Sequence, residues 1–127
     1  MSRFLLLACF GMLFFAQPAA AQTASKPVPP AVAANLLKKP NTVVLDVRTP
    51  AEFATGHLKG AQNIDFRAPG FEDKISKLDK SKTYILYCAS GNRSGQTTVL
   101  MEETGFKQII NAGAFEDLQK AGLKTAK

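Results

Sequence analysis

Residues 84–96 of this chain read Tyr-Ile-Leu-Tyr-Cys-Ala-Ser-Gly-Asn-Arg-Ser-Gly-Gln. The first four are apolar or aromatic and predict a buried strand that ends at Cys88. The small polar residues that follow predict a short loop, which carries Arg93 and then opens a helix. A cysteine at this position lies among backbone N–H groups at the positive end of a helix dipole. Because these groups favour thiolate over thiol, the stretch predicts a reactive sulfur nucleophile at Cys88.

A second apolar run, residues 42–47, shows no alternation of polar and apolar residues, which is typical of a strand buried on both faces of a parallel sheet. Thr49 and Pro50 predict a helix that Gly56 ends. Weaker patterns predict strands at residues 61–64 and 108–110 and helices at residues 31–38, 71–78, 94–104 and 114–121. Strands therefore alternate with helices, and the fold class is α/β with a mostly parallel central sheet.

Two predicted loops should meet at one edge of this sheet. In open α/β sheets, ligands bind beyond the carboxyl ends of the strands. Asp46, Val47 and Arg48 end one strand there, and Cys88 ends another. We therefore expect these residues to share one rim.

The amino-terminal residues predict export. Arg3, an apolar run at residues 4–15 and small residues before Gln22 have the layout of a secretory signal peptide, residues 1–21. The apolar run is shorter than the ~20 residues of a spanning helix, so we favour a signal peptide over an uncleaved membrane anchor. Residues 22–30 are polar and proline-rich and predict an extended tether. Residues 31–127 should then form one domain, with no stable membrane association after cleavage.

Export also changes the meaning of the two cysteines. Cys9 leaves with the signal peptide, so Cys88 is the one cysteine of the remaining chain. A single cysteine in an exported protein is either a buried, inert residue or a reactive thiol. The loop around Cys88 favours the reactive thiol.

The charge of the chain excludes one class of partner. The net charge is +6, from 16 Lys and Arg against 10 Asp and Glu, and the lysines are scattered along the sequence. No basic stripe interleaved with aromatic residues is present, so we do not expect nucleic-acid binding.

Three motifs, taken together and in this order, resemble those of single-domain rhodaneses (thiosulfate sulfurtransferases). They are Asp-Val-Arg-Thr-Pro-Ala-Glu-Phe at residues 46–53, Gly-His-Leu-Lys-Gly-Ala-Gln-Asn-Ile at residues 56–64, and the cysteine loop at residues 88–94. The resemblance spans about residues 45–113. It implies a compact sheet with helices on both faces and an active-site loop after a central strand. With its export signal, the chain is similar to the small periplasmic rhodaneses of bacteria, which implies a periplasmic location.

The resemblance also implies the chemistry. Cys88 would take a sulfane sulfur from thiosulfate, or from a persulfide or thiosulfonate, and pass it from a Cys88 persulfide to cyanide or a thiol. No cofactor and no metal is implied, and we expect a monomer or weak dimer. The residues implied to bind the anionic donor are those of the loop, Ala89, Ser90, Gly91, Asn92, Arg93 and Ser94.

Several flanking residues allow two interpretations. Arg93 either binds the anionic end of the donor or braces the loop. Arg48 and Glu52 lie at i,i+4, which favours a structural ion pair between them. Asp46 either orients Arg93 or a loop amide from behind the site, or holds the turn. His57 is the only histidine, and we expect it to be structural and hydrogen-bonded.

The rest of the loop also limits the donor. Ala89 and Ser90 are neutral, so Arg93 is the only cation in the loop, and a persulfide or thiosulfonate donor fits as well as thiosulfate. Ser90 and Asn92 are ordinary loop formers first and ligands second.

Three other classes of protein share some of these features. Cysteine phosphatases and arsenate reductases also use a cysteine, loop amides and an arginine, but four residues separate Cys88 from Arg93, one fewer than in the phosphatases. A shorter loop favours a sulfur atom over a phosphate, and no second cysteine is placed to resolve an arsenate intermediate. A thioredoxin-like protein needs Cys-x-x-Cys, which is absent. A non-catalytic rhodanese-like binding module commonly lacks the cysteine, whereas this chain has Cys88, Gly91 and Arg93.

Overall fold

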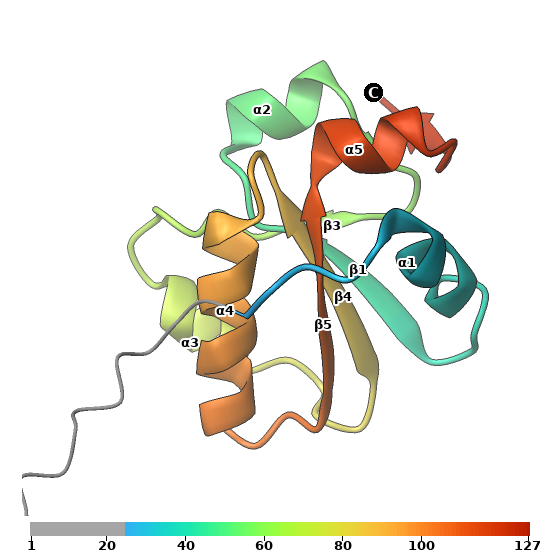
Figure 1. The fold of residues 1–127 in the computed structure, drawn as a ribbon. Helices are drawn as coiled ribbons and strands as arrows, with labels where there is room; N and C mark the ends of the chain where they lie inside the picture. Colours follow the sequence, from blue (N-terminus) through green and yellow to red (C-terminus); the bar gives the residue numbers. More distant parts are fainter. Residues whose placement is uncertain (1–24) are drawn as a thin grey trace, which may run out of the picture.

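The structure is a computed structural model and describes residues 25–127 (Figure 1). The predicted signal peptide and the first residues of the predicted tether lie outside the described residues. Within residues 25–127, no helix combines the length and apolar character needed to span a membrane. In chain order the elements are α1 (Pro30–Leu36), β1 (Thr42–Asp46), α2 (Pro50–Thr55), β2 (His57–Leu58), β3 (Gln62–Asn63), α3 (Phe71–Ser76), β4 (Thr83–Cys88), α4 (Asn92–Glu103), β5 (Gln108–Ala114), α5 (Phe115–Lys120) and β6 (Thr125–Ala126).

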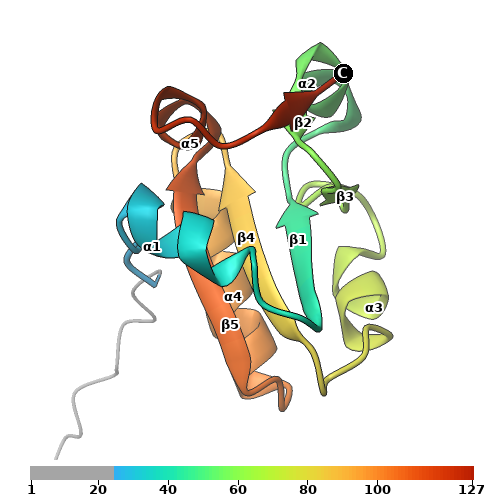
Figure 2. The ribbon, with the colours of Figure 1, turned by 90° about the vertical axis from the view of Figure 1, so that its right-hand side faces the viewer.

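The main sheet has the strand order β3-β1-β4-β5, and all neighbouring strands are parallel. α3 and α4 cover one face, and α1 and α5 cover the other (Figures 1 and 2). Because both faces are covered, β4 is buried at every residue from Tyr84 to Cys88. This arrangement confirms the predicted α/β class and the helices on both faces.

Side chains alternate along β4 between two hydrophobic clusters. Tyr84, Leu86 and Cys88 face α3 and α4 and pack with residues that include Leu45 and Met101. The intervening Ile85 and Tyr87 face the side of α1 and α5. Cys88 therefore lies at the upper edge of a packed core, and this fixes its position.

One helix, α4, and one strand, β5, extend beyond their predicted ends. α4 begins at Asn92, two residues earlier than predicted, because Gly91 takes up the left-handed conformation (φ 91°) and serves as the N-cap residue. β5 continues to Ala114, whereas the prediction stopped at residue 110. Polar and glycine residues weaken the strand pattern there, but pairing with β4 extends the strand.

A small antiparallel ribbon, β2 with β6, was not predicted. Each strand has two residues, too few to give a periodic pattern. The ribbon ties the carboxyl terminus to the chain after α2, and the terminus lies close to α2 (Figure 2). Tyr87 joins this ribbon to the main sheet, because its hydroxyl oxygen accepts a hydrogen bond from the Leu58 N–H at 2.9 Å.

The last residues of the predicted tether lie against the domain. The backbone N–H of Val28 donates to the Asn111 carbonyl at 2.9 Å, and that of Ser25 donates to the Gly95 carbonyl at 3.3 Å. Residues 25–28 therefore follow the outer edge of β5 and reach the first turns of α4.

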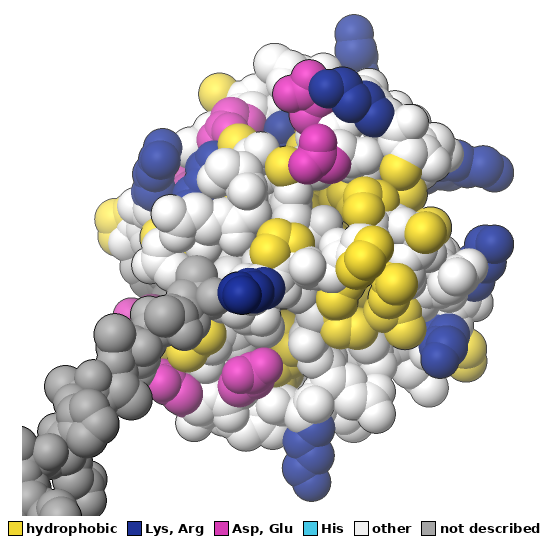
Figure 3. All heavy atoms as spheres, in the orientation of Figure 1, with side chains coloured by type: hydrophobic (Ala, Val, Ile, Leu, Met, Phe, Trp, Pro, Cys, Tyr) yellow, Lys and Arg dark blue, Asp and Glu magenta, His cyan; other side chains and the backbone are white. Residues whose placement is uncertain are grey.

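Among residues 25–127, Val32 is the one large hydrophobic residue that is exposed. On the face shown in Figure 3, hydrophobic side chains gather over α1, where Val32 is 42% exposed. Lysine and arginine side chains stand apart from one another on this face. The charge distribution seen here agrees with the scattered lysines of the sequence.

Candidate active site

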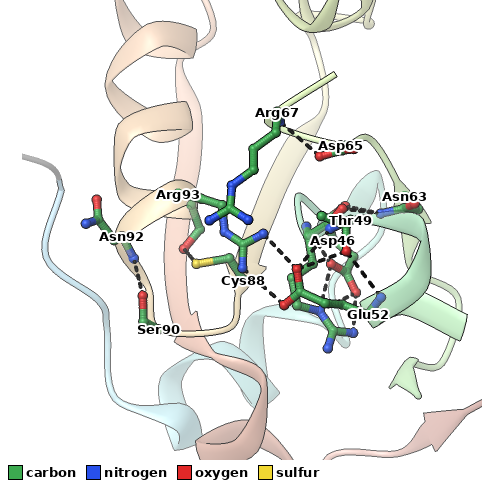
Figure 4. Close-up of polar contacts among 12 residues, drawn as sticks. Asp46, Thr49, Glu52, Asn63, Asp65, Arg67, Cys88, Ser90, Asn92 and Arg93 are labelled. Carbon is green, nitrogen blue, oxygen red and sulfur yellow. Dashed lines mark hydrogen bonds and ion pairs between the residues drawn. The ribbon is translucent and has the colours of Figure 1, made fainter. Parts of the chain in front are cut away.

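Cys88 ends β4 at the carboxyl edge of the sheet, and α4 begins four residues later at Asn92. β1 is the neighbouring strand, with Asp46 opposite Tyr87. The backbone N–H of Val47 donates to the Tyr87 carbonyl at 3.1 Å, so the pairing continues past the end of β1. The structure thus brings the two predicted loops together at one rim (Figure 4).

The Cys88 sulfur accepts hydrogen bonds from the loop that follows it. The Gly91 N–H donates to Sγ at 3.0 Å, and the Ser94 hydroxyl lies 3.5 Å from Sγ. The N-cap residue Gly91 provides no side-chain cap for α4, and the N–H of the first helical residue, Asn92, donates to the Ser90 hydroxyl at 3.4 Å. Burial raises the pKa of the Cys88 thiol, but hydrogen bonds from the Ser94 hydroxyl and from the Ser94, Ser90 and Gly91 N–H groups outweigh burial and lower the pKa below its ordinary value.

Cys88 is fully buried, with 0% of the residue exposed. Ala89 and Ser90, which follow it, are exposed. The Arg93 side chain extends from the first turn of α4 past Cys88 toward Glu52 (Figure 4). The sulfur is therefore shielded from solvent in this structure.

Arg93 forms a two-pronged ion pair with Glu52 on α2. Its Nη1 donates to Oε1 at 2.9 Å, and its Nη2 donates to Oε2 at 3.1 Å. The hydrogen bonds from Arg93 lower the pKa of Glu52 to about 2, although partial burial opposes this. Oε1 of Glu52 also accepts from the N–H and hydroxyl of Thr49, which completes a capping box at the start of α2.

The predicted ion pair between Arg48 and Glu52 is wrong. Arg48 precedes the helix, so the i,i+4 spacing of a helix surface does not apply to it. Its guanidinium pairs instead with Asp46, with Nη2 2.7 Å from Oδ2, and donates to the Gly56 carbonyl at 2.6 Å. Burial lowers the pKa of Arg48, but hydrogen bonds to Asp46 and its charge outweigh this, and the pKa lies above its ordinary value.

Asp46 holds the turn after β1, which is one of its two predicted roles. Its Oδ1 accepts from the Arg48 N–H at 2.9 Å and from the Arg48 Nε at 3.0 Å. Arg48 lies 4.4 Å from the centre of the Phe115 ring, on the side of the sheet away from α4. The buried Asp46–Arg48 pair therefore supports the rim from below, and Arg93 takes Glu52 as its carboxylate partner.

His57 makes the contacts of a structural residue. Its Nδ1 lies 3.1 Å from the Phe53 carbonyl oxygen, and its ring stacks on the Phe53 ring with centroids 3.7 Å apart. These contacts hold the end of α2 against β2. Within residues 25–127, no group of three or more His, Cys, Asp or Glu residues is arranged to bind a metal ion.

The exposed residues of the loop make local contacts. The Ser90 hydroxyl accepts from the Asn92 N–H at 3.4 Å, and Asn92 Oδ1 accepts from Gln96 Nε2 at 2.7 Å. Both residues shape the loop, as predicted for ordinary loop formers. The side-chain polar groups of both residues border the site, and the Ser90 N–H also acts on the Cys88 sulfur.

Three residues near the site were not predicted from the sequence. Asn63 donates from Nδ2 to the carbonyls of Asp46 and Arg48 at 3.0 and 2.9 Å. Arg67 is exposed, and its side chain points toward Arg93 (Figure 4). Asn111 on β5 lies behind the loop. Asn63 lies inside the second sequence motif, and this could have identified it. Arg67 and Asn111 lie outside the three motifs, and only the tertiary fold brings them to the site.

The sequence and the fold are similar to those of known proteins. The sequence profile of the Rhodanese-like domain matches residues 29–121, and the chain belongs to this family. It is 31% identical over 80 residues to the thiosulfate sulfurtransferase PspE of Escherichia coli (strain K12), covering 63% of this chain and 77% of that protein. It is 34% identical over 92 residues to the thiosulfate sulfurtransferase GlpE of Pseudomonas putida, covering 72% and 82%.

Solved structures and more distant relatives extend the comparison. A rhodanese-related protein from Thermoplasma volcanium has a TM-score of 0.69 and 25% identity, over 80% of this chain and 97% of that one. A tRNA uridine(34) hydroxylase of Pelagibacter ubique is 35% identical over 77 residues, covering 58% of this chain and 25% of that protein. The resemblance to single-domain rhodaneses is confirmed, and the family contains more than one activity.

Proposed function

We propose that this protein is a sulfurtransferase that carries a sulfane sulfur as a persulfide on Cys88. The observation that supports this most is the hydrogen bond that the Cys88 sulfur accepts from the Gly91 N–H, at 3.0 Å, at the start of α4. This environment favours a thiolate, and thiolate is the nucleophilic form of cysteine. Relatives named thiosulfate sulfurtransferase make thiosulfate the first donor to test.

The first step is attack of the Cys88 thiolate on the sulfane sulfur of the donor. A new S–S bond forms to Cys88, and the S–S bond of thiosulfate breaks, so that its electron pair leaves with sulfite. With a thiosulfonate donor the leaving group is a sulfinate, and with a persulfide donor it is a thiolate. No proton needs to move, and the charge of the thiolate reappears on the persulfide.

The second step returns the enzyme to its starting form. Cyanide or a thiolate acceptor attacks the outer sulfur of the persulfide, and the S–S bond to Cys88 breaks. Thiocyanate or a new persulfide leaves, and the Cys88 thiolate is restored. The loop N–H groups that hold the thiolate are placed to hold the anionic persulfide, which divides the transfer into two simple displacements.

Two arginines supply the charge that an anionic donor needs near an anionic nucleophile. Arg93 extends past Cys88, and Arg67, in the loop after β3, points toward Arg93. The Ile64 and Phe66 N–H groups donate to the Asp46 and Val47 carbonyls at 3.0 and 3.2 Å, which fixes this loop beside the rim. We assign donor binding to Arg67, Arg93 and the N–H groups of residues 89–94.

The location of the reaction follows from the predicted export signal. The protein would then act outside the cytoplasm, in the bacterial periplasm, on small anionic sulfur donors and on cyanide or a thiol. Thiocyanate formation is only an assay of this activity. The acceptor in the cell would be a thiol of the same compartment.

The experiment is a steady-state assay of thiocyanate formation with thiosulfate, a thiosulfonate and a persulfide as donors. Cys88→Ser should abolish turnover with all of them. Arg67→Ala should raise KM for thiosulfate, whereas Lys107→Ala, which removes an exposed cation before β5 at the opposite edge of the sheet, should not. Turnover that persists in Cys88→Ser contradicts the proposal.

The same assay tests a non-catalytic binding module, which the complete burial of Cys88 favours. Such a module would show no turnover with any donor and no change on Cys88→Ser. Release of phosphate from an aryl phosphate would instead indicate a cysteine phosphatase.

A further inference from the structure

Asn111 on β5 is almost completely buried, with 1% of the residue exposed, and its side chain lies behind the active-site loop. Its Oδ1 accepts from the Ser94 hydroxyl at 2.7 Å and from the Gly113 N–H at 3.0 Å. Its Nδ2 donates to the Gly91 carbonyl at 3.1 Å and to the Ser25 carbonyl at 2.7 Å. The amide therefore uses both donors and both acceptor positions that an asparagine has.

Asn111 lies directly before an irregularity in β5. Asn111 lies opposite Leu86, but the next residue of β4, Tyr87, lies opposite Gly113, so Ala112 is an extra residue. Such bulges redirect side chains and are common beside active sites. Asn111 faces α4 and Ser94, whereas Ala112 packs with the cluster on the other face of the sheet.

The Ser94 hydroxyl has one hydrogen and two possible acceptors. Asn111 Oδ1 lies 2.7 Å away, an ordinary distance for a bond between a hydroxyl and an oxygen, whereas Cys88 Sγ lies at 3.5 Å. The hydrogen can be given to only one acceptor at a time. The Ser94 hydroxyl therefore lowers the pKa of Cys88 only while its hydrogen lies on the sulfur; while the hydrogen lies on Asn111, the sulfur keeps only the hydrogen bonds from backbone N–H groups.

We propose that Asn111 is a positioning residue that holds the Ser94 hydroxyl hydrogen on its own amide oxygen and so limits hydrogen bonding to the Cys88 sulfur. The inference rests on the proposed role of Cys88 as the nucleophile. A thiolate that accepts fewer hydrogen bonds is more basic, and thiolate nucleophilicity rises with basicity. Asn111 thereby affects two opposing quantities: the fraction of Cys88 that is thiolate, and the nucleophilicity of that thiolate.

The test is a titration of the Cys88 thiolate by its ultraviolet absorbance in the full chain, with Cys88→Ser subtracted as the background. Asn111→Ala frees the Ser94 hydrogen for the sulfur and should lower the Cys88 pKa by roughly half a unit to one unit. Asn111→Asp keeps an acceptor oxygen for Ser94 and adds a negative charge, so it should leave the pKa unchanged or raise it. Only Asn111→Ala is thus expected to lower the pKa of Cys88.

The matched control removes the hydrogen itself. In a Ser94→Ala background, Asn111→Ala should no longer lower the pKa of Cys88. An equal fall in that background would show that Asn111 acts through the loop backbone and would overturn the proposal. An unchanged or raised pKa in Asn111→Ala alone would do the same, and so would a fall in Asn111→Asp.

The titration also separates this inference from the proposed function. A purely structural role for Asn111 would lower the melting temperature without moving the titration. If Asn111→Ala does not fold, Ser94→Ala alone decides: a Ser94 hydrogen held on Asn111 predicts little change in the Cys88 pKa there, and a clear rise would overturn the proposal. The titration needs no sulfur donor, so a failure of sulfur transfer leaves its outcome readable.

Discussion

The Cys88 sulfur is subject to two opposing effects, burial and hydrogen bonding. Burial favours the neutral thiol, and the hydrogen bonds of the loop favour the thiolate. In this structure the hydrogen bonds outweigh burial, and the pKa of Cys88 lies below its ordinary value. Cys88 is also fully buried, so the residue whose hydrogen bonds favour the reactive thiolate is shielded from solvent.

The lowered pKa predicts the pH dependence of alkylation at Cys88. Because the thiolate is the reacting form, the rate of reaction with iodoacetamide should rise with pH and level off below the ~8.5 of an ordinary cysteine. Peptide mass spectrometry after timed labelling separates Cys88 from Cys9. A rate that still rises steeply at pH 9 would show that burial outweighs the hydrogen bonds.

Glu52 occupies the anion-binding fork of Arg93 and should compete with an anionic donor. Glu52→Gln removes the charge but retains a side chain that can complete the capping box. It should lower KM for thiosulfate about two- to fivefold, the range expected for loss of a partly exposed ion pair. Donor titrations in the thiocyanate assay measure this effect.

The matched comparison for Glu52→Gln is the same substitution in an Arg93→Ala background. There the change should have little effect on KM, because Arg93 is the group that Glu52 occupies. A KM that is unchanged or higher in the single variant would mean that Glu52 positions Arg93 for the donor and does not compete with it.

At the scale of elements, the unit that forms the site is β4, its loop and α4. Gly91 ends the loop with φ 91°, and a Cβ atom there would lie 3.2 Å from the Gly113 Cα and 3.4 Å from the Pro27 Cγ. Gly113 of β5 and Pro27 thus pack closely against the loop at Gly91. The N–H that Gly91 donates to sulfur depends on this close packing.

Gly91→Ala should therefore weaken both the fold and the site. The strained backbone should cost about 1–3 kcal/mol, and displacement of the N–H should raise the Cys88 pKa. Gly122→Ala is the matched control, because Gly122 has the same φ of 91° with nothing within 4 Å of an added Cβ. Urea unfolding and thiolate titration compare the two. Equal effects on the Cys88 pKa would contradict the assigned role of the Gly91 N–H.

The elements that could be predicted from the sequence are those whose signal is local. The apolar runs of β1 and β4 and the Thr49–Pro50 start of α2 follow from residue chemistry alone. The meeting of Cys88 with the end of β1 followed from the rule that parallel strands share an edge. Arg93 and Glu52 are 41 residues apart, so their pairing is decided by tertiary packing, and the sequence spacing pointed to Arg48 instead.

At the scale of the whole molecule, two sheets of different size are joined at Tyr87. Its hydroxyl accepts from the Leu58 N–H at 2.9 Å, and β2 in turn pairs with β6 near the carboxyl terminus. Burial raises the pKa of Tyr87 well above its ordinary value, so the hydroxyl stays neutral. One buried hydrogen bond therefore connects the central strand to the end of the chain.

Tyr87→Phe should lower the free energy of unfolding by about 1–3 kcal/mol, because it leaves the buried Leu58 N–H without its acceptor. Tyr84→Phe is the comparison, since the Tyr84 hydroxyl donates to the carbonyl of the exposed Asp79, which water can satisfy. Urea unfolding should show the larger loss for Tyr87→Phe. The reverse order would mean that the ribbon contributes little to stability.

The measurement that tests the central claim most directly is the intact mass of the protein after incubation with thiosulfate and removal of excess donor. Sulfur transfer through Cys88 predicts a gain of one sulfur atom in the unaltered protein, its loss on addition of cyanide, and no gain in Cys88→Ser. A protein whose mass does not change while thiocyanate is formed, or a gain that persists in Cys88→Ser, would contradict a persulfide on Cys88.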